Sequence, residues 1–498
     1  MKSRLAILAI LVVAAFLRLW KLNAFGFNSD EAVYAGQAAA IAGDAALSGI
    51  FPIFRAHPLL HQFLLALIYL AGVTDLTARL LSVAIGLATI VVVYLLGRLL
   101  YGPRAGFLAA LFMALMPYHV MVSRQVLLDG TLVFCATLTL YLLANYAQTG
   151  RSIWLLGAGV GLGLTFLAKE TGIILLGAVF AFLALSPEIR MRLPQLGLSL
   201  GLMLVVMLPF PASLLISGRS VAGQSYLVWQ LLRRPNHPWD FYATHVPQVI
   251  GYLVIILALL GLWLARRDRS WRERLLLLWI VVPILFFQLW PTKGFQYLLP
   301  IAPALSILAA RTLASLSAAA SSSAQRSSAV SRMLTVVLTV VVALTLTASS
   351  WARIQPASTG TFLAGTGGLP GGREAGIWIL ENVPEGASFL TIGPSMANVI
   401  QFYGHRKARG LSISANPLRR NPAYEPVVNP DLQIRLGEIH YLVWDSFSAG
   451  RSPFFSERLL RLAEQFGANV VHTESVTLPA EGGGTVEQPL IVIYEVRL

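Results

Sequence analysis

Long apolar segments separated by short polar ones recur along the first 352 residues of the chain. Most of them have about the 20 residues that a helix needs to cross a hydrocarbon core of ~30 Å. The pattern therefore predicts a polytopic, mainly α-helical membrane protein. The eleven predicted spans are residues 5–22, 77–100, 104–121, 130–147, 152–167, 170–186, 195–216, 248–265, 275–290, 296–316 and 333–352.

The segment between the first two spans, residues 23–76, is too long for a tight turn and more apolar than a free loop. We expect residues 30–46 to form a helix that lies in the membrane interface, and residues 59–71 to form a second such helix or a partial insertion. An alternative is that residues 59–73 cross the membrane, which would invert the sidedness of every later loop. The arginine pattern argues against that alternative.

Basic residues gather in alternate loops of the predicted topology. Under the positive-inside rule these loops and the N-terminus are cytoplasmic, and the C-terminal part is extracytoplasmic. The protein is then expected in the cell membrane, with the lipid bilayer as a partner. The basic loop residues are Lys2, Arg4, Arg98, Arg104, Arg151, Arg190, Arg192, those of the run 266–274, Arg326 and Arg332.

Hydrophobicity falls sharply after Trp351. Residues 353–372 are rich in Gly, Pro, Ser and Thr and are predicted to be a linker. Residues 373–498 are predicted to form a small soluble α/β domain. Its expected helices are Arg373–Val383 and Ser456–Phe466, and its expected strands are Ser388–Ile392, His440–Trp444, Asn469–His472 and Leu490–Val496.

The composition agrees with a membrane protein, because 56% of residues are hydrophobic and only 12% are charged, against about 25% charged in soluble domains. The net charge of +14 does not predict a nucleic-acid partner, since the basic residues lie in short loops without interleaved aromatics. The single cysteine, Cys135, excludes an intrachain disulfide. The start of the chain lacks a small-residue cleavage site before Trp20, so we expect a retained first helix.

Polar residues occur at the outer ends of several predicted spans. Carboxylates this close to a bilayer are costly unless they face water, a partner or a substrate. Carboxylates among cations suit a reaction in which an acid accepts a proton while basic groups hold an anionic leaving group. The outer-end residues are Asp30 and Glu31, Arg124 with Asp129, Lys169 and Glu170, and Lys293, with residues 55–61 between the first two sites.

These motifs, in this order, resemble the signature series of the GT-C glycosyltransferases. Their nearest resemblance is to the protein O-mannosyltransferases and the lipid A aminoarabinose transferases. In two places the chain departs from that pattern: one proline, Pro58, stands where relatives often have two, and Gln296 stands where a basic residue is common. The motifs are Phe27-Asn28-Ser29-Asp30-Glu31, His57-Pro58-Leu59, the segment 123–130, the segment 167–172 and the segment 293–300.

The resemblance implies transfer of one sugar from a polyprenyl-phosphate donor to an acceptor on the outer face, with inversion at the anomeric carbon. The acceptor, a protein, a lipid or a glycan, stays unidentified. Asp30 matches the family's catalytic base, and Asp129 matches its second acidic position. The implied catalytic residues are Asp30, Glu31 and Asp129, and the implied substrate-binding residues are His57, Arg124, Lys169, Lys293 and Tyr297.

Each site residue also has a purely structural interpretation. Asp30 is a favoured residue type for a helix N-cap, and Glu31 has a nearby cation as an alternative partner. Arg124 and Asp129 are spaced to form a surface ion pair. Lys169 is placed to extend toward lipid headgroups, and His57 next to a proline is a common turn residue.

No metal site is predicted, because the eight histidines are scattered and the carboxylates form no oxygen cage. A divalent cation stays open as a cofactor, since related GT-C enzymes that attack amides use one. Two other functions also stay open. One is a transporter or flippase of lipid-linked sugars, which should carry repeated halves and charges near the bilayer midplane. The other is a non-catalytic scaffold.

Overall fold

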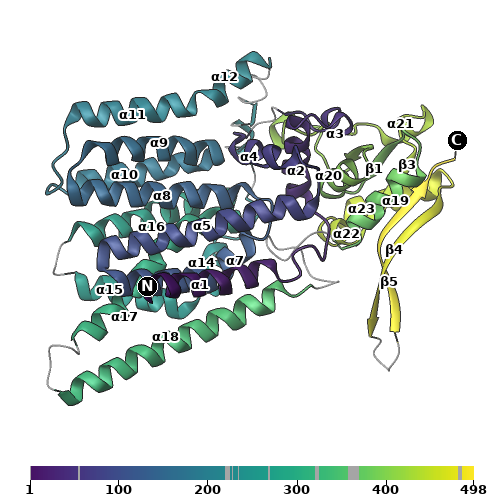
Figure 1. Cartoon of the computed structure of the whole chain (residues 1–498). Coiled ribbons are helices and arrows are strands. Elements are labelled where there is room, and N and C mark those ends of the chain that lie inside the picture. Colours follow the sequence, from purple (N-terminus) through teal and green to yellow (C-terminus); the bar gives the residue numbers. More distant parts are fainter. Residues whose placement is uncertain are drawn as a thin grey trace.

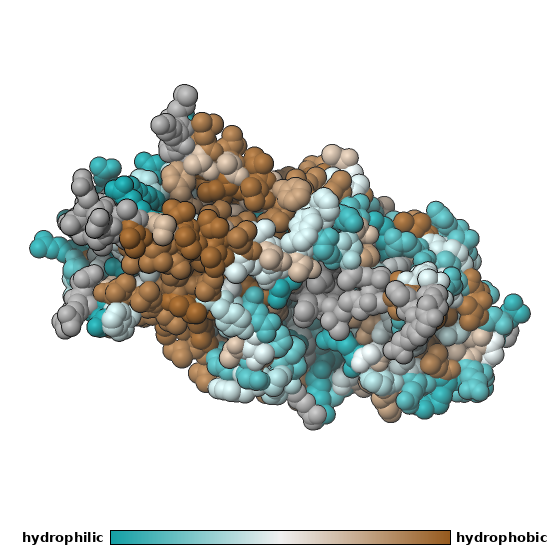
Figure 2. All heavy atoms as spheres, turned by 90° about the horizontal axis from the view of Figure 1, so that it is seen from below, coloured by the Kyte–Doolittle hydropathy of each residue, from teal (hydrophilic) through white to brown (hydrophobic). Residues whose placement is uncertain are grey.

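The computed structural model describes two parts of the chain, a helical bundle up to Ile354 and an α/β part from Gly372 (Figure 1). In Figure 2, hydrophobic residues gather over the bundle and hydrophilic ones over the α/β part. Arg55 and Ala56, parts of loop 217–247 and most of the predicted linker fall outside the description. The described residues are 2–53, 57–218, 225–226, 228–230, 232–233, 235–266, 270–319, 325–356, 370–479 and 485–497.

The bundle helices follow the predicted apolar segments. Proline ends two of them early, since it cannot continue the hydrogen-bond ladder of a preceding turn: Pro117 follows α6, and Pro209 follows α11. The bundle contains α1 (Lys2–Leu19), α5 (Asp75–Tyr101), α6 (Pro103–Leu115), α7 (Pro117–Val122), α8 (Leu128–Thr149), α9 (Ser152–Ala168), the 3₁₀ helix η1 (Glu170–Ile173), α10 (Ile174–Leu185), α11 (Leu193–Met207), α12 (Pro209–Ile216), α14 (Phe241–Ile250), α15 (Tyr252–Ala265), α16 (Trp271–Leu289), the 3₁₀ helix η2 (Phe295–Ile301), α17 (Ala302–Ala319) and α18 (Gln325–Ile354).

Among the described residues, five helices are long and apolar enough to cross a membrane. A sixth is formed if α14 and α15 count as one span bent by 95°. The bend falls at Gly251, whose φ of +95° favours glycine. Several other predicted spans are helices of 10–17 residues. The count of eleven spans therefore stays a prediction.

Close helix contacts in the bundle depend on small residues, as is common in membrane helices. A Cβ atom at Gly161 of α9 would lie 2.5 Å from Oγ1 of Thr139 on α8. On another face, a Cβ at Gly159 would lie 2.2 Å from the carbonyl oxygen of Ser199 on α11. Glycine at these positions therefore lets α9 pack tightly against both neighbours.

The first long loop contains α2 (Ser29–Ile41), α3 (Ala45–Ser48) and α4 (Leu60–Tyr69). The ten residues of α4 span about 15 Å, half of the ~30 Å needed to cross a membrane. The alternative in which this segment crosses the membrane therefore finds no support. α2 packs against α4 and against helix α20 (Pro394–Tyr403) of the α/β part, so it is enclosed by protein.

The α/β part is a five-stranded sheet with the order β2-β1-β3-β5-β4. The first three strands in this order are parallel, and β5 pairs antiparallel with β3 and with β4. All four strands predicted from the sequence are present, but β2 and helices α20 to α22 were not predicted. The elements are α19 (Gly372–Asn382), β1 (Ser388–Thr391), α20 (Pro394–Tyr403), β2 (Lys407–Gly410), η3 (Pro417–Arg419), α21 (Pro430–Arg435), β3 (Tyr441–Asp445), α22 (Ser446–Arg451), α23 (Pro453–Gln465), β4 (Asn469–Pro479) and β5 (Thr485–Glu495).

Specific polar contacts join the α/β part to the bundle. The Asp75 carboxylate, at the start of α5, accepts hydrogen bonds from Arg373 and Tyr403. The Tyr403 hydroxyl in turn accepts from the backbone N–H of Phe27 at 2.6 Å. These contacts hold the α/β part over the end of the bundle where α2 begins.

The turns that join α5 to α6, α8 to α9 and α10 to α11, which contain predicted basic loop residues, lie at the opposite end of the bundle (Figure 1). Glu273, at the start of α16, accepts a hydrogen bond from Tyr101 and forms an ion pair with Arg311. Nearby, Arg274 pairs with Glu188 of the loop between α10 and α11. Alternate loops of the bundle therefore lie at one end, as the predicted topology requires. Which side of a membrane this end faces stays a prediction.

Candidate active site

A cavity of about 460 Å³ lies between the end of the bundle and the α/β part. Both parts contribute to its wall, so the site depends on their docking. From the bundle side it is lined by Asp30, Tyr34, His57, Lys169, Glu170, Tyr226, Trp229, Gln230, Arg233, Gln296 and Tyr297, and from the α/β part by Pro394, Ser412, Ile413, Ser414, Arg419, Arg420, Asn421 and Tyr424.

Asp30 lies in the first turn of α2 and is exposed to this cavity. The N-cap is Asn28, whose side chain accepts from the backbone N–H groups of Asp30 and Glu31. The capping interpretation of Asp30 is therefore wrong. Within the described residues, the Asp30 carboxylate makes no hydrogen bond or ion pair. Enclosure by protein raises its pKa above 3.8, although Lys169 and His57 act in the opposite direction.

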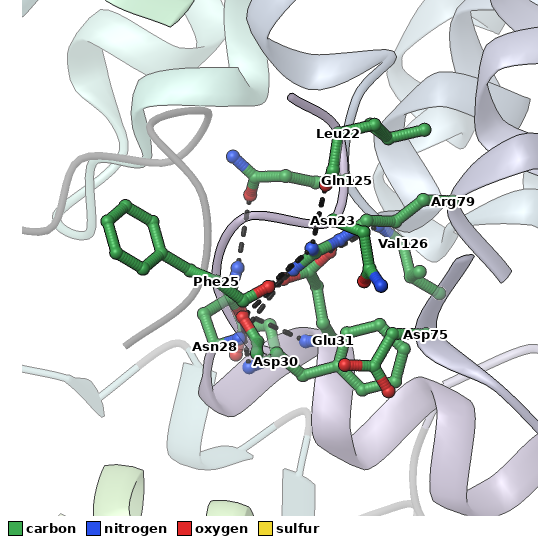
Figure 3. Close-up of polar contacts among 12 residues, drawn as sticks. Leu22, Asn23, Phe25, Asn28, Asp30, Glu31, Asp75, Arg79, Gln125 and Val126 are labelled. Atoms are coloured by element: carbon green, nitrogen blue, oxygen red, sulfur yellow. Dashed lines mark hydrogen bonds and ion pairs between the residues drawn. The ribbon is translucent and has the colours of Figure 1, made fainter. Parts of the chain in front are cut away.

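Glu31 does not line the cavity, which corrects its prediction as a catalytic residue. Its carboxylate is fully buried and accepts two hydrogen bonds from the Arg79 guanidinium, both at 2.9 Å (Figure 3). It also accepts from the backbone N–H groups of Asn28 and Val126, each at 3.1 Å. Every oxygen of Glu31 is thus engaged, and its role is to fix the start of α2.

Lys169 and Asp129 form a buried pair at the edge of the cavity. The Lys169 ammonium donates to both carboxylate oxygens of Asp129, each at 2.9 Å, and lies 4.9 Å from the centre of the Tyr297 ring. The headgroup interpretation of Lys169 is therefore wrong. Lys169 and Tyr297 face the cavity, whereas Asp129 lies behind them beside a small pocket.

His57 is held between two polar groups on the cavity wall. Its Nδ1 lies 3.1 Å from Oε2 of Glu170, and its Nε2 lies 3.2 Å from the hydroxyl of Tyr226. The Tyr226 hydroxyl also accepts a hydrogen bond from Gln230 at 2.6 Å. His57 is thus held in place on the cavity wall, and it links Tyr226 of loop 217–247 to the bundle.

Two residues predicted to bind substrate lie elsewhere. Arg124 donates to the carbonyl oxygens of Leu17 and Arg18 at the C-terminal end of α1, which is a favourable place for a cation. Lys293 donates to the carbonyl oxygen of Gln288 and packs against aromatic rings. Neither side chain lines the cavity, so both predictions are corrected. The ion pair considered between Arg124 and Asp129 is not present either.

Arg233 is the cavity cation that the sequence analysis missed on the bundle side. Its guanidinium lies 4.3 Å from the centre of the Trp229 ring and donates to Gln230 at 3.1 Å. A signal was present: Tyr226, Gln230 and Arg233 recur at helical spacing of four and three residues.

The arginines of the α/β part were missed too. Arg419 and Arg420 lie in a long, largely irregular segment between β2 and α21 that contains only the short 3₁₀ helix η3. Segments of this kind inside a compact domain often carry function. The length of this segment was the available signal.

The carboxylates in and beside the cavity do not suit a divalent metal. Asp129 is engaged by Lys169, and Glu170 by His57, which leaves Asp30 as a single unpaired ligand. Over the described part of the chain, no group of three or more His, Cys, Asp or Glu residues is placed to hold an ion. The divalent cation left open from the sequence therefore has no fitting site among these residues.

Comparison with known proteins identifies the architecture. Residues 56–214 match the family model of dolichyl-phosphate-mannose-protein mannosyltransferases, and residues 236–357 match the Alg9-like mannosyltransferase family. An apo structure of ArnT from Cupriavidus metallidurans superposes with a TM-score of 0.69, at 18% identity, over 98% of this chain and 97% of that one. The chain has the GT-C fold. The resemblance seen in the motifs is confirmed.

Two further proteins share features with this GT-C-fold chain. The undecaprenyl phosphate-α-4-amino-4-deoxy-L-arabinose arabinosyl transferase 1 of Pseudomonas fluorescens is 26% identical over 243 residues, 45% of this chain. The match covers 43% of that transferase, so this chain spans less than half of its length. The oligosaccharyltransferase AglB of Archaeoglobus fulgidus superposes with a TM-score of 0.61 at 13% identity, over 98% of this chain and 74% of that one.

Proposed function

We propose that this protein is a membrane glycosyltransferase that moves one sugar from a polyprenyl-phosphate-linked donor to a hydroxyl-bearing acceptor. One observation carries the proposal: the unpaired carboxylate of Asp30 faces the same cavity as the cations Lys169 and Arg233. The matched families and relatives are named as mannosyl- and arabinosyltransferases. ArnT has also been solved bound to undecaprenyl phosphate, which supports a donor of this class.

Asp30 is proposed as the general base. As the acceptor hydroxyl attacks the anomeric carbon, Asp30 takes its proton, the new C–O bond forms, and the bond from the sugar to the phosphate oxygen breaks. A base positioned in this way contributes about 10²–10⁴-fold to the rate. The raised pKa of Asp30 makes its carboxylate a stronger proton acceptor than a solvated one.

The cations around the cavity are proposed to bind the departing polyprenyl phosphate. Arg233 is the better candidate for direct contact, because its guanidinium fork matches phosphate oxygens and its charge is not neutralised by a carboxylate of the described chain. Lys169 is held in place by Asp129, which fixes its direction. Asp129 therefore acts as a positioning residue in this proposal.

Direct displacement by one acceptor hydroxyl would invert the configuration of the anomeric carbon. The single unpaired carboxylate supports this course, since a double displacement needs a second carboxylate as nucleophile. We further propose that the reaction takes place at the extracytoplasmic face of the cell membrane. The collection of basic loops at the end of the bundle away from the cavity supports that sidedness.

The transporter alternative predicts ionisable residues near the middle of the bundle together with repeated halves. In the described structure, the unpaired carboxylate and the cavity cations lie at one end of the bundle. This placement favours chemistry at a surface over passage through the bundle. Accumulation of intact labelled donor across a vesicle membrane, without covalent transfer, would reverse that preference.

The test is sugar transfer by the purified full-length protein from a radiolabelled polyprenyl-phosphate sugar, with membrane lipids and glycans as acceptors. We expect Asp30→Asn to lower transfer by about 10²–10⁴-fold, with donor binding retained. Asp44→Asn is the matched control, because Asp44 caps α3 outside the cavity and asparagine caps equally well. Equal transfer by wild type and Asp30→Asn would refute the proposed base.

A further inference from the structure

A second, smaller cavity of about 140 Å³ lies against Asp30 on the side of the α/β part. Asp30 is the one described residue that lines both cavities, so its carboxylate stands at their junction. A general base must contact the acceptor hydroxyl, whereas the donor phosphate needs the cations of the larger cavity. The residues that line the smaller cavity are Asn28, Ser29, Asp30, Ser395, Val399, Phe447 and Arg451.

The smaller cavity coincides with the topological switch point of the sheet. β1 lies between β2 on one side and β3 on the other, and all three strands are parallel. Ser395 follows the carboxyl end of β1, and Phe447 and Arg451 follow the carboxyl end of β3. Open α/β sheets bind their ligands in the crevice at this position.

The polar groups of the smaller cavity differ in their availability. Asn28 is occupied by the cap and by Gln125, and the Ser29 hydroxyl accepts from Asn398. The Arg451 guanidinium lies 5.3 Å from the centre of the Phe447 ring. Within the described chain it makes no hydrogen bond or ion pair. Arg451 thus offers free donors and a positive charge beside an aromatic ring.

We propose that the smaller cavity is the acceptor subsite, and that it takes a sugar-like acceptor with an anionic group next to its reactive hydroxyl. The inference rests on the proposed function. The acceptor ring packs on Phe447, its anionic group binds Arg451, and its hydroxyl reaches Asp30. The donor approaches Asp30 from the larger cavity. The α/β part then selects the acceptor, and the bundle holds the donor.

The experiment compares three soluble acceptors that share one ring: octyl glucoside, octyl glucuronide and octyl glucoside 6-phosphate. We expect the wild type to transfer sugar to at least one charged acceptor about tenfold faster than to octyl glucoside. Octyl glucoside has no anionic group and so lacks the charge-assisted contact with Arg451. The two charged arms separate a carboxylate acceptor from a phosphate acceptor. Arg451→Ala should abolish the preference and leave the KM for the donor unchanged.

Arg461→Ala is the matched control, because Arg461 lies on the exposed face of α23 beside Glu457. Retention of the charge preference in Arg451→Ala, or equal rates with all three acceptors in the wild type, would overturn the acceptor subsite. Donor cleavage by the wild type, with transfer to water or membrane glycans, separates that failure from a failure of the proposed function. Absence of any donor cleavage in the wild type would refute the proposed function itself.

Discussion

The cavity and the buried cluster around Arg79 adjoin each other at the start of α2. The two neighbouring carboxylates there, Asp30 and Glu31, differ in whether they have a partner. In the cluster, Glu31 is saturated by Arg79 and by backbone N–H groups. In the cavity, Asp30 is exposed and unpaired among the described residues. A saturated carboxylate holds the structure together, whereas an unpaired one is available to a substrate.

The pairing of carboxylates with cations separates structural from chemical roles throughout this site. Asp129 and Glu170 have their own partners in Lys169 and His57. Removal of a partner from a buried pair is costly because it leaves an uncompensated charge. Removal of Asp30 leaves no such charge behind. The comparison therefore predicts that stability and activity respond to different substitutions.

The largest expected effect on stability comes from Arg79→Ala. Arg79 is buried, and its loss leaves the Glu31 carboxylate unpaired, so the free energy of unfolding should fall by about 3–5 kcal/mol. The measurement is the thermal unfolding midpoint of the protein in detergent. Arg461→Ala serves as control, since an exposed pair contributes little. Asp30→Asn should leave the midpoint unchanged or slightly raised. A drop as large as that of Arg79→Ala would show that Asp30 stabilises the fold as Glu31 does, and would contradict the distinction between the two carboxylates.

Asp445 is a buried carboxylate that has no cation partner among the described residues, so it shows what burial alone does to stability. One oxygen accepts from the Ser448 backbone N–H at 2.7 Å, and the other has no partner among the described residues. Burial raises the pKa of Asp445 from 3.8 to about 6. Because the folded state holds this proton more tightly than the unfolded chain, the added stability is full below pH ~4 and is lost as pH rises through about 6.

Asp445→Asn should therefore stabilise the protein at pH 7.5 by roughly 2–3 kcal/mol, the equivalent of a shift of about two pKa units. Asparagine keeps the acceptor for Ser448 and carries no charge. The advantage should shrink toward zero near pH 4, as measured by unfolding midpoints of both proteins across this range. A pH-independent difference between them would contradict the assignment.

A smaller effect is expected from Arg233→Ala. Arg233 faces the cavity and has no ion-pair partner among the described residues, so its loss should raise the KM for the donor about tenfold, as for one lost charge-assisted contact. The unfolding midpoint should not change. Arg151→Ala, in the exposed turn between α8 and α9, is the control. An unchanged donor KM in Arg233→Ala would remove this residue from the donor site.

The most subtle test is the acid limb of the pH–rate profile. The rate should rise with pH as Asp30 loses its proton, and the midpoint should lie above 3.8 because enclosure raises the pKa of this carboxyl. The same limb should persist in Asp445→Asn, whose substitution lies outside the cavity. A midpoint at or below 3.8 would contradict the raised pKa of Asp30 and would mean that water reaches this carboxylate more freely than in the structure.

Much of the fold was predictable because its signals are local. Apolar length and turn composition located the bundle helices and four strands of the α/β part. Proline breaks and the short elements β2 and α20 to α22 were harder to predict, because four to ten residues carry little periodic signal. In the site, four of the residues that the motifs single out, Asp30, His57, Lys169 and Tyr297, line one cavity, and their roles stay predictions.

The sequence by itself determined the apolar helices, the α/β part and the presence of acids and bases near the outer ends of helices. The tertiary structure decided which of these groups is available. Successive residues on a helix point about 100° apart, so Asp30 faces the cavity while Glu31 faces Arg79, which lies 48 positions away in the chain. Which residues become partners at such sequence separations depends on how the helices pack. A local sequence pattern therefore does not predict these pairs.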